Sequence, residues 1–342
     1  MSGIAAQPFS VAADVHGSGP AFAPTIGELG SKLSKPTFAR LLAQMKSGTP
    51  AADVAKEYLA TVGMNKLGPR PLVRVGSKDF TEQYVLGELY AQALEARGFP
   101  VERHLGLGAT AVADAAVRAG RIDFYPEYTG TSYTAVLGKS VKPGMQASAT
   151  WRAVRDGYRK RGMRVLNATP FSNGNAIVVT QATADKYHLH TLTDLAKVSS
   201  KLSFGAIPGF TSRVDGMPLL QKVYGMQFGS VNSYQDSLKY AALADGKVDA
   251  VYGFETDGPI AARHLVTLTD NKHAWPAYQA APILSDKFAA SVGPDFTATI
   301  NNVSSLLDAA TMRRLNADVD QNGKEPEAVA HAFLLQHDLV AK

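Results

Sequence analysis

The stretch AGRIDFYPEYTGT, residues 119–131, decides how the rest of the chain is interpreted. A short apolar run stops at Pro126, with Tyr125 and Tyr128 on either side of the Pro-Glu pair and small hydroxyl residues after them. A strand that ends in an ordinary surface turn carries Gly, Asn, Asp or Ser at this point. Rings and hydroxyls at the end of a buried strand therefore raise the question of what that strand end faces.

A second stretch, YAALADGKVDAVYGFETDG at residues 240–258, follows the same plan. Each stretch has a helix ended by a glycine (Gly120 or Gly246), a basic residue, a short strand containing Asp, and then aromatic residues and a Thr. Ligands of open α/β sheets bind beyond the carboxyl ends of the strands. The repeat therefore predicts two lobes whose strand ends face each other across a cleft.

The sequence around the first stretch alternates between strand and helix patterns. Strands are expected at residues 72–76, 101–105 and 121–125, and helices at residues 79–98 and 110–118. Asp79 and Glu82 have the spacing of a capping box for the first of these helices, and Gly98 ends it. The alternation predicts an α/β fold with a mostly parallel sheet and helices on its faces.

The first 70 residues differ from the rest of the chain. Residues 1–35 are rich in Ala, Gly, Pro and Ser, which predicts a poorly ordered segment. Residues 36–64 have the pattern of two short helices, the second starting at Pro50. The first of these helices carries an apolar stripe of Phe38, Leu41, Leu42 and Met45. Residues 1–70 are therefore expected to be a disordered segment plus a short helical extension, with the main domain starting at about Leu72.

The composition limits the classes of function. The 342 residues are 45% hydrophobic and 19% charged and include no cysteine, which excludes disulfides and thiolate chemistry. A net charge of +5 without a dense Lys/Arg block argues against a nucleic-acid partner. No apolar run approaches the ~18 residues of a membrane-spanning helix. The first residues lack the basic and apolar regions of a signal peptide, which leaves a removed leader and a cytoplasmic protein as alternatives.

Patterns for metal binding and catalysis are weak. DVDQNG, residues 318–323, begins like a calcium loop, but its twelfth position is Val329 instead of a bidentate Glu, so we expect a helix end at Gly323. His188 and His190 have no third metal ligand nearby in the sequence, and there is no G-x-S-x-G motif. The sequence therefore predicts no metal, no cofactor and no enzymatic activity.

Aromatic and basic residues at the strand ends suit a ligand that is cationic at one end and anionic at the other. A quaternary ammonium ion donates no hydrogen bond, so a site recognises it by surrounding it with π-faces. The candidate rings are Tyr128, Phe254 and Tyr278, and the candidates for a carboxylate are Lys78 and Arg213. The alternative for each residue alone is ordinary core or surface packing.

Five stretches together resemble the substrate-binding proteins of osmoprotectant ABC importers, which bind glycine betaine, choline, carnitine and proline betaine. They are VGSKDFTEQYVLGELYAQALEARGF, LGLGATAVADAAVRAGRIDFYPEYTGT, SRVDGMPLLQKVYGM, FETDG and WPAYQAAPIL. The resemblance covers residues 72–342 and is most specific at S-K-x-F-T-E-Q and Y-P-E-Y-T-G-T. It implies a two-lobed periplasmic-binding-protein fold of the second type with two crossover strands as its hinge. The repeated plan and the apolar crossover candidates place lobe 1 at residues 72–176 and 275–342, and lobe 2 at residues 177–273.

The resemblance also implies an aromatic cage for a trimethylammonium group and basic residues for a carboxylate. Lys78 matches the lysine of the first motif, and Tyr128 and Thr131 match the cage tyrosine and the hydroxyl of the second. Arg213 matches the arginine that binds the carboxylate, and Tyr278 matches the tyrosine of the P-x-Y-x-A-A-P stretch. The strand at residues 121–125 is therefore expected to end in aromatic rings because its tip is a wall of the cleft.

Two positions depart from the family pattern, in which tyrosines are usual. Phe254 keeps an aromatic face but has no hydroxyl group, whereas Asn175 supplies no ring and would leave one side of the cage open. Asn173 and Asn175 could offer amide hydrogen bonds to a larger or more polar ligand. The alternative is that Phe80 or Tyr133 fills the gap from another strand end.

These observations predict an extracytoplasmic, periplasmic solute-binding protein. It would bind a small betaine-like zwitterion or quaternary amine, act as a monomer and deliver its ligand to the membrane permease of an ABC importer. The alternative from another class is a sensory module of the same fold in a signalling system.

Overall fold

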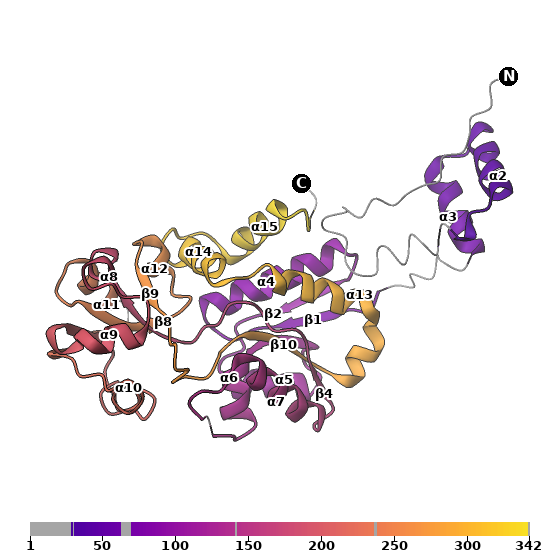
Figure 1. Ribbon diagram of the computed structural model, residues 1–342. Helices are drawn as coiled ribbons and strands as arrows, with labels where there is room; N and C mark the ends of the chain where they lie inside the picture. The colour runs from indigo at the N-terminus through magenta and orange to yellow at the C-terminus, as the bar shows by residue number, and fades with distance from the viewer. Residues whose placement is uncertain (1–28, 30, 63–69, 141, 236–237, 341–342) are drawn as a thin grey trace. The chain divides into compact units, whose positions relative to one another are not determined.

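The computed structural model describes residues 29, 31–62, 70–140, 142–235 and 238–340 of the chain (Figure 1). They belong to two compact units, an N-terminal one and one that extends from Arg70 to Gln336, and each is described by itself. The segment for which disorder was predicted, residues 1–35, lies almost entirely outside the described residues.

The described part of the N-terminal unit includes the helices α2 (Lys35–Lys46) and α3 (Ala51–Thr61), which contact each other. They lie where the sequence pattern indicates two short helices. Val54 and Tyr58 of α3 are buried, but the apolar stripe predicted on α2 is not, since that helix has no buried residue. Pro50 precedes the first turn of α3 and makes no side-chain cap.

The unit from Arg70 to Gln336 contains two five-stranded sheets. The first has the order β2-β1-β3-β10-β4, with β1 parallel to β2 and β3 and with β10 antiparallel to β3 and β4. Its strands are β1 (Val73–Gly76), β2 (Val101–His104), β3 (Phe124–Tyr128), β4 (Met163–Val165) and β10 (Ala280–Ser285). The first three strands thus form the parallel arrangement that the alternation predicts, and a strand from much later in the chain is inserted beside β3.

Strand β3 continues through Pro126 to Tyr128, so the prediction that it stops at the proline was wrong. Pro126 lies opposite Pro282 of β10, and three pairs further along, Thr129 and Gln279 are hydrogen-bonded through the Thr129 N–H. Because hydrogen-bonded pairs alternate along an antiparallel ladder, the two prolines face each other at a position where neither needs an N–H group toward its partner.

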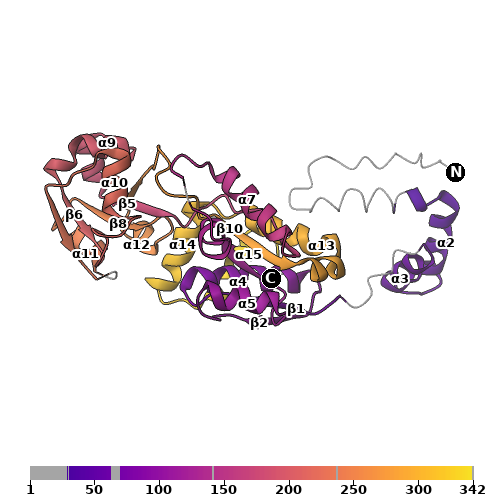
Figure 2. The same cartoon turned by 90° about the horizontal axis from the view of Figure 1, so that it is seen from below.

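Helices cover both faces of the first sheet (Figures 1 and 2). One face carries α4 (Thr81–Ala96), α13 (Asp286–Ser305) and α15 (Pro326–Gln336), and the other carries α5 (Thr110–Arg118), the short α6 (Thr129–Thr131) and α7 (Ala147–Arg159). Neighbouring residues of β3 point to opposite faces. Phe124 packs edge-on against Tyr90 and Phe296 on the α4 side, whereas Tyr125 belongs to the core on the α5 and α7 side.

The second sheet repeats the first, with the order β7-β6-β8-β5-β9. Here β6 is parallel to β7 and β8, and β5 is antiparallel to β8 and β9. Its strands are β5 (Asn175–Val179), β6 (Ser203–Ala206), β7 (Ser230–Ser233), β8 (Ala250–Phe254) and β9 (Val266–Leu268). Strands β3 and β8, which contain the two stretches of similar sequence, therefore hold the same central place in their sheets. The α/β two-lobed fold is confirmed, and lobe boundaries near residues 176 and 275 remain a proposal.

The helices beside the second sheet are five to eight residues long. They are α8 (Gln181–Tyr187), α9 (Leu192–Val198), α10 (Met217–Tyr224), α11 (Lys239–Ala244) and α12 (Gly258–Ala262). Helix α12 contacts α14 (Ala309–Asp320), which also packs on α4 of the first sheet. A Cβ atom on Gly258 would lie 2.9 Å from the backbone of Ala317, so glycine allows this close contact between α12 and α14.

Two helix ends can be compared with the sequence patterns. Helix α4 begins at Thr81 after Phe80, and no side chain caps it, so the predicted capping box of Asp79 and Glu82 was wrong. The DVDQNG segment is the end of α14, with Gly323 in the left-handed region at a φ of 66°, as the helix-end interpretation predicts. The Asp318 carboxylate there accepts hydrogen bonds from Asn322 and Lys324.

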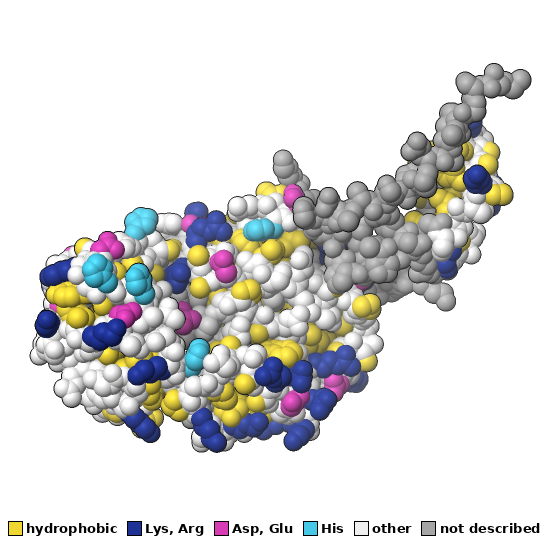
Figure 3. Space-filling model, viewed as in Figure 1, with side chains coloured by type: hydrophobic (Ala, Val, Ile, Leu, Met, Phe, Trp, Pro, Cys, Tyr) yellow, Lys and Arg dark blue, Asp and Glu magenta, His cyan; other side chains and the backbone are white. Residues whose placement is uncertain are grey.

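Figure 3 shows Lys and Arg side chains gathered over the lower part of the molecule, where Figure 1 places α7, with Asp and Glu side chains among them. Arg155 pairs with Asp156, and Arg164 pairs with Asp286. Basic and acidic residues are therefore interleaved on this surface.

Candidate ligand-binding site

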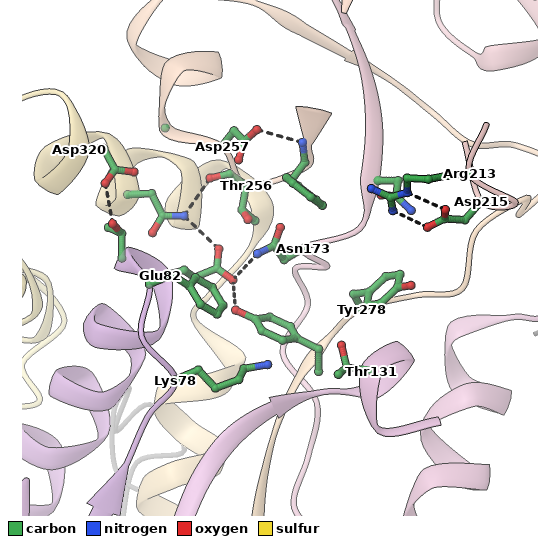
Figure 4. A pocket seen from close by; sticks show the side chains of 17 residues that line it. Lys78, Glu82, Thr131, Asn173, Arg213, Asp215, Thr256, Asp257, Tyr278 and Asp320 are labelled. Carbon is green, nitrogen blue, oxygen red and sulfur yellow. Dashed lines mark hydrogen bonds and ion pairs between the residues drawn. The ribbon is translucent and has the colours of Figure 1, made fainter. Parts of the chain in front are cut away.

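A cavity of about 550 Å³ lies where the ends of β3 and β8 approach each other (Figure 4). All eight residues predicted from the sequence line it: Lys78, Tyr128, Thr131, Asn173, Asn175, Arg213, Phe254 and Tyr278. Nine further residues line the cavity: Phe80, which is the alternative ring named above, and the unassigned Thr81, Glu82, Asp215, Thr256, Asp257, Gly258, Asn316 and Asp320. The structure thus brings the predicted residues together, and their roles in binding remain predictions.

Glu82 is the centre of a buried hydrogen-bond network on one side of the cavity (Figure 4). Its Oε1 accepts hydrogen bonds from the Tyr128 hydroxyl at 2.5 Å and from Asn173 Nδ2 at 3.1 Å, and its Oε2 accepts one from Asn316 Nδ2 at 3.0 Å. Burial raises the pKa of the Glu82 carboxyl, and hydrogen bonds from Thr256 and these three side chains oppose that rise. The network fixes the ring of Tyr128 from its hydroxyl end.

A buried ion pair lies beside the same ring. Lys78 Nζ is 2.5 Å from Glu127 Oε1, and both side chains are almost fully buried. The ammonium lies 4.5 Å from the centre of the Tyr128 ring and 5.7 Å from that of Phe80, and the two rings are stacked with their centres 6.2 Å apart. The positive charge predicted to meet a ligand carboxylate is therefore already paired with a carboxylate of the protein.

The second sheet places a similar set of groups at the end of β8. Lys239 Nζ, fully buried, lies 3.6 Å from Asp257 and between 5.0 and 5.8 Å from the ring centres of Tyr240, Tyr252 and Phe254. Asp257 also accepts hydrogen bonds from the Tyr240 hydroxyl at 2.5 Å and the Phe254 N–H at 3.0 Å. The carboxylate anchors the turn that follows β8 and holds Phe254 at the cavity.

Arg213 lies on the opposite side of the cavity from Glu82, beside Tyr278 (Figure 4). Its guanidinium binds Asp215 through two atoms, Nε to Oδ1 at 3.0 Å and Nη2 to Oδ2 at 2.7 Å, and its side chain is 43% exposed. The hydrogen bond from Arg213 lowers the pKa of Asp215. Nη1 of Arg213 has no hydrogen-bond partner among the described residues and stays available for an anion.

Asn175, the position without the expected ring, is buried and bonded to a tyrosine behind it. Its Oδ1 accepts a hydrogen bond from the Tyr252 hydroxyl at 2.6 Å. Of the two aromatic residues that could fill the gap, Phe80 lines the cavity and Tyr133 does not. Tyr278 packs over Gly130, where a Cβ atom would lie 2.7 Å from the ring, so glycine is needed for this ring to reach the cavity.

Three of the unassigned residues, Glu82, Asn316 and Asp320, differ in the sequence signal that could have identified them. Glu82 lies within the S-K-x-F-T-E-Q motif, which was a usable signal, but it was assigned to a helix cap instead. Asn316 and Asp320 come from α14, far along the chain, and no motif connects them with the strand ends. Their place in the site depends on the packing of α14 against α4 and α12.

A second cavity of about 330 Å³ lies on the other side of Asn175 and contains Glu255, the residue after Phe254. The Glu255 N–H donates to the Gly174 carbonyl, and its side chain is half-buried. Burial raises the pKa of this carboxyl to about 7, against smaller opposing effects from Ser172 and Arg313. Glu255 therefore changes its charge near neutral pH.

Two sheets of one topology with a cavity between their strand ends define a solute-binding protein of the periplasmic type. Residues 71–336 match the family model "Substrate binding domain of ABC-type glycine betaine transport system", and the chain belongs to this family. No group of three or more potential metal ligands and no helix able to cross a membrane occurs in the described part of the chain.

Individual relatives agree with this assignment. The chain is 32% identical over 279 residues to the glycine-betaine-binding protein of Pseudomonas aeruginosa, covering 78% of this chain and 88% of the relative. It is 30% identical over 288 residues to the carnitine transport binding protein OpuCC of Listeria monocytogenes, covering 82% and 92%. A crystal structure described as a glycine betaine/carnitine/choline ABC transporter matches with a TM-score of 0.74 and 30% identity, covering 78% of this chain and 99% of that one.

Proposed function

We propose that this chain is an extracytoplasmic, periplasmic solute-binding protein that delivers a small quaternary-ammonium or zwitterionic compatible solute to the permease of an ABC importer. Membership of the family supports the transport role. The observation that carries the ligand class is the set of rings around one cavity: Phe80 and Tyr128 from the first sheet's side, Phe254 from the second sheet and Tyr278 from the segment before β10.

The charges of the lining support a cationic ligand group. The two basic side chains of the lining, Lys78 and Arg213, are each paired with a carboxylate, and Asp257 is paired with Lys239. The lining also contains two further acidic residues, Glu82 and Asp320. An excess of acidic groups next to aromatic faces favours a cation, because both attract positive charge. A volume of about 550 Å³ accommodates a solute of the size of betaine or carnitine.

Each of the eight predicted residues would have a distinct role in ligand binding. Tyr128, Phe254 and Tyr278 would surround the trimethylammonium group, and Arg213 would meet a carboxylate through Nη1. Lys78 would hold the ring of Tyr128 and keep the local charge balanced by Glu127. The remaining lining residues Thr131, Asn173 and Asn175 would supply polar contacts. We propose a role in binding only, without catalysis.

A thermal-shift and calorimetric screen against glycine betaine, choline and carnitine tests the proposal. A ligand at 100 times its Kd should add about 2.7 kcal/mol to the free energy of unfolding. The matched control is 3,3-dimethylbutan-1-ol, which has the shape of choline without its charge and should give no shift, because a neutral group gains no cation–π energy. Absence of binding by every quaternary ammonium compound would contradict the proposal.

A further inference from the structure

Two amide side chains of the cavity present carbonyl oxygens that have no hydrogen-bond partner among the described residues. They are Asn316 Oδ1 and Asn173 Oδ1, and both atoms are buried. The Asn316 side chain as a whole is 5% exposed, and both residues line the cavity. Buried amide oxygens without a partner are rare in folded proteins, so this pair requires an explanation.

The orientation of both amides is fixed by their nitrogens. Asn316 Nδ2 donates to Glu82 at 3.0 Å and to the Thr256 carbonyl at 2.8 Å, and Asn173 Nδ2 donates to Glu82 at 3.1 Å. A flipped amide would place its oxygen against the Glu82 carboxyl and lose these bonds. The oxygens are therefore the groups that remain for a partner outside the network.

Hydrogen-bond acceptors predominate on this side of the cavity. Its groups are the Glu82 carboxyl, the Thr256 carbonyl and the two amide oxygens, all of them acceptors, and the bonds to Glu82 and Thr256 use both amide protons of Asn316 and one of the two on Asn173. A ligand carboxylate would find here the Glu82 carboxyl and one amide proton of Asn173, whereas the guanidinium of Arg213 lies on the opposite side of the cavity (Figure 4). An O–H or N–H group would find two acceptors that are already desolvated.

On the basis of the proposed function, we propose that Asn316 and Asn173 select a quaternary-ammonium ligand that also carries a hydrogen-bond donor, O–H or N–H. Glycine betaine has no such donor, so it would occupy the ring cage and leave both amide oxygens unsatisfied. A site built to bind a donor discriminates against a ligand that lacks it, because the buried acceptor stays unpaired.

Two pairs of ligands of almost equal shape test the donor and identify its kind. Choline against propyltrimethylammonium replaces a hydroxyl by a methyl group, and betaine amide against betaine methyl ester replaces an NH₂ by an O–CH₃ group. Calorimetric titration of the purified chain gives a ratio of Kd values for each pair. We expect the donor-bearing member to bind about five- to a hundredfold more tightly in at least one pair, and that pair identifies O–H or N–H.

Substitutions assign the effect to the two amides. Asn316→Leu should bring the ratio of the two Kd values closer to one. If Asn316→Leu does not fold, Asn173→Leu, at a less buried position, provides the same test. The matched control is Asn301→Leu, an amide outside the cavity whose oxygen already accepts a hydrogen bond from the Asn167 N–H at 3.1 Å. It should leave the ratio unchanged even if all affinities fall, because the ratio compares two ligands in one variant.

The outcomes are distinct. Equal affinities within both pairs, with all four compounds bound, would overturn this inference and leave the proposed function standing. A preference that survives Asn316→Leu and Asn173→Leu unchanged would also overturn it, since the donor would then bind elsewhere. Failure of all four compounds to bind would overturn the proposed function, and this inference with it.

Discussion

The ends of β3 and β8 occupy equivalent places in two sheets of the same strand order, yet they form different walls of the cavity. At β3, the Lys78–Glu127 pair is 2.5 Å long and buried, and the ring of Tyr128 is fixed by its bond to Glu82. At β8, the corresponding ion pair between Lys239 and Asp257 is 3.6 Å long.

The ring at β8 also lacks a polar anchor, because Phe254 has no hydroxyl group. The ring of Tyr128 has Lys78 4.5 Å from its centre and a hydrogen bond from its hydroxyl, whereas Phe254 has Lys239 at 5.8 Å from its ring centre and a hydrogen bond from its backbone N–H. One strand plan has thus given a rigid, polar wall and an apolar wall. This difference suits a ligand with a polar part and a trimethylammonium part.

Breaking the Lys78–Glu127 ion pair at the end of β3 should cause the largest loss of stability among these predictions. Glu127→Gln leaves the Lys78 ammonium buried without a counter-charge and should lower the free energy of unfolding by about 3–5 kcal/mol. Asp257→Asn should cost clearly less, because its ion pair is longer and Asp257 is partly exposed. Urea unfolding of both variants measures the difference.

A double variant separates charge burial from lost packing. Replacing both partners, Lys78→Met with Glu127→Gln, removes the unpaired charge and should recover part of the stability lost in Glu127→Gln alone. Equal losses for Glu127→Gln and Asp257→Asn would show that the two walls do not differ in the way described.

The residue after each cavity ring gives a second contrast, since Thr129 follows Tyr128 and the ionisable Glu255 follows Phe254. The pKa of Glu255 is raised from its usual value of 4.5 to about 7 in the folded protein. The folded state then holds a proton that the unfolded state has released, so stability falls as pH rises from about 4.5 to 7 and is constant above that.

Glu255→Gln should abolish this slope and stabilise the protein at pH 8 by up to about 3 kcal/mol. Partial exposure of the side chain reduces that figure. Thermal unfolding of both proteins between pH 5 and pH 8 measures it, and Asp286→Asn, at an exposed surface ion pair, serves as the control. An unchanged slope in Glu255→Gln would assign the pH dependence to other groups.

The sequence predicted the fold and the set of rings because both depend on local patterns. The alternation of strands and helices and the repeat around β3 and β8 are local, and so are the motifs that contain Lys78 and Tyr128. Contacts that join distant segments could not be predicted: Glu82 has the spacing of a helix cap, and only the approach of Asn173 and Asn316 makes it the centre of a network. Local spacing also failed at Pro126, because the tolerance of β3 for proline depends on β10, more than 150 residues later.

The smallest effect is expected for substitution of Arg213, the basic group on the β8 side of the cavity, and it concerns ligand affinity. If Arg213 bound the ligand carboxylate through two nitrogens, Arg213→Ala would cause a large loss of affinity. Two nitrogens of Arg213 already bind Asp215, however, and the side chain is 43% exposed. Arg213→Ala should therefore weaken carnitine by only about 1 kcal/mol and leave choline, which has no carboxylate, almost unchanged.

Asp215→Asn is the matched test, because it frees the Arg213 guanidinium from its competitor in the protein. It should tighten carnitine relative to choline, and the gain should shrink at high salt, since exposed charges are screened. Calorimetric titrations of the three proteins with both ligands give these differences. Equal changes for carnitine and choline in Arg213→Ala would mean that the arginine supports the fold around Tyr278 and does not bind the carboxylate.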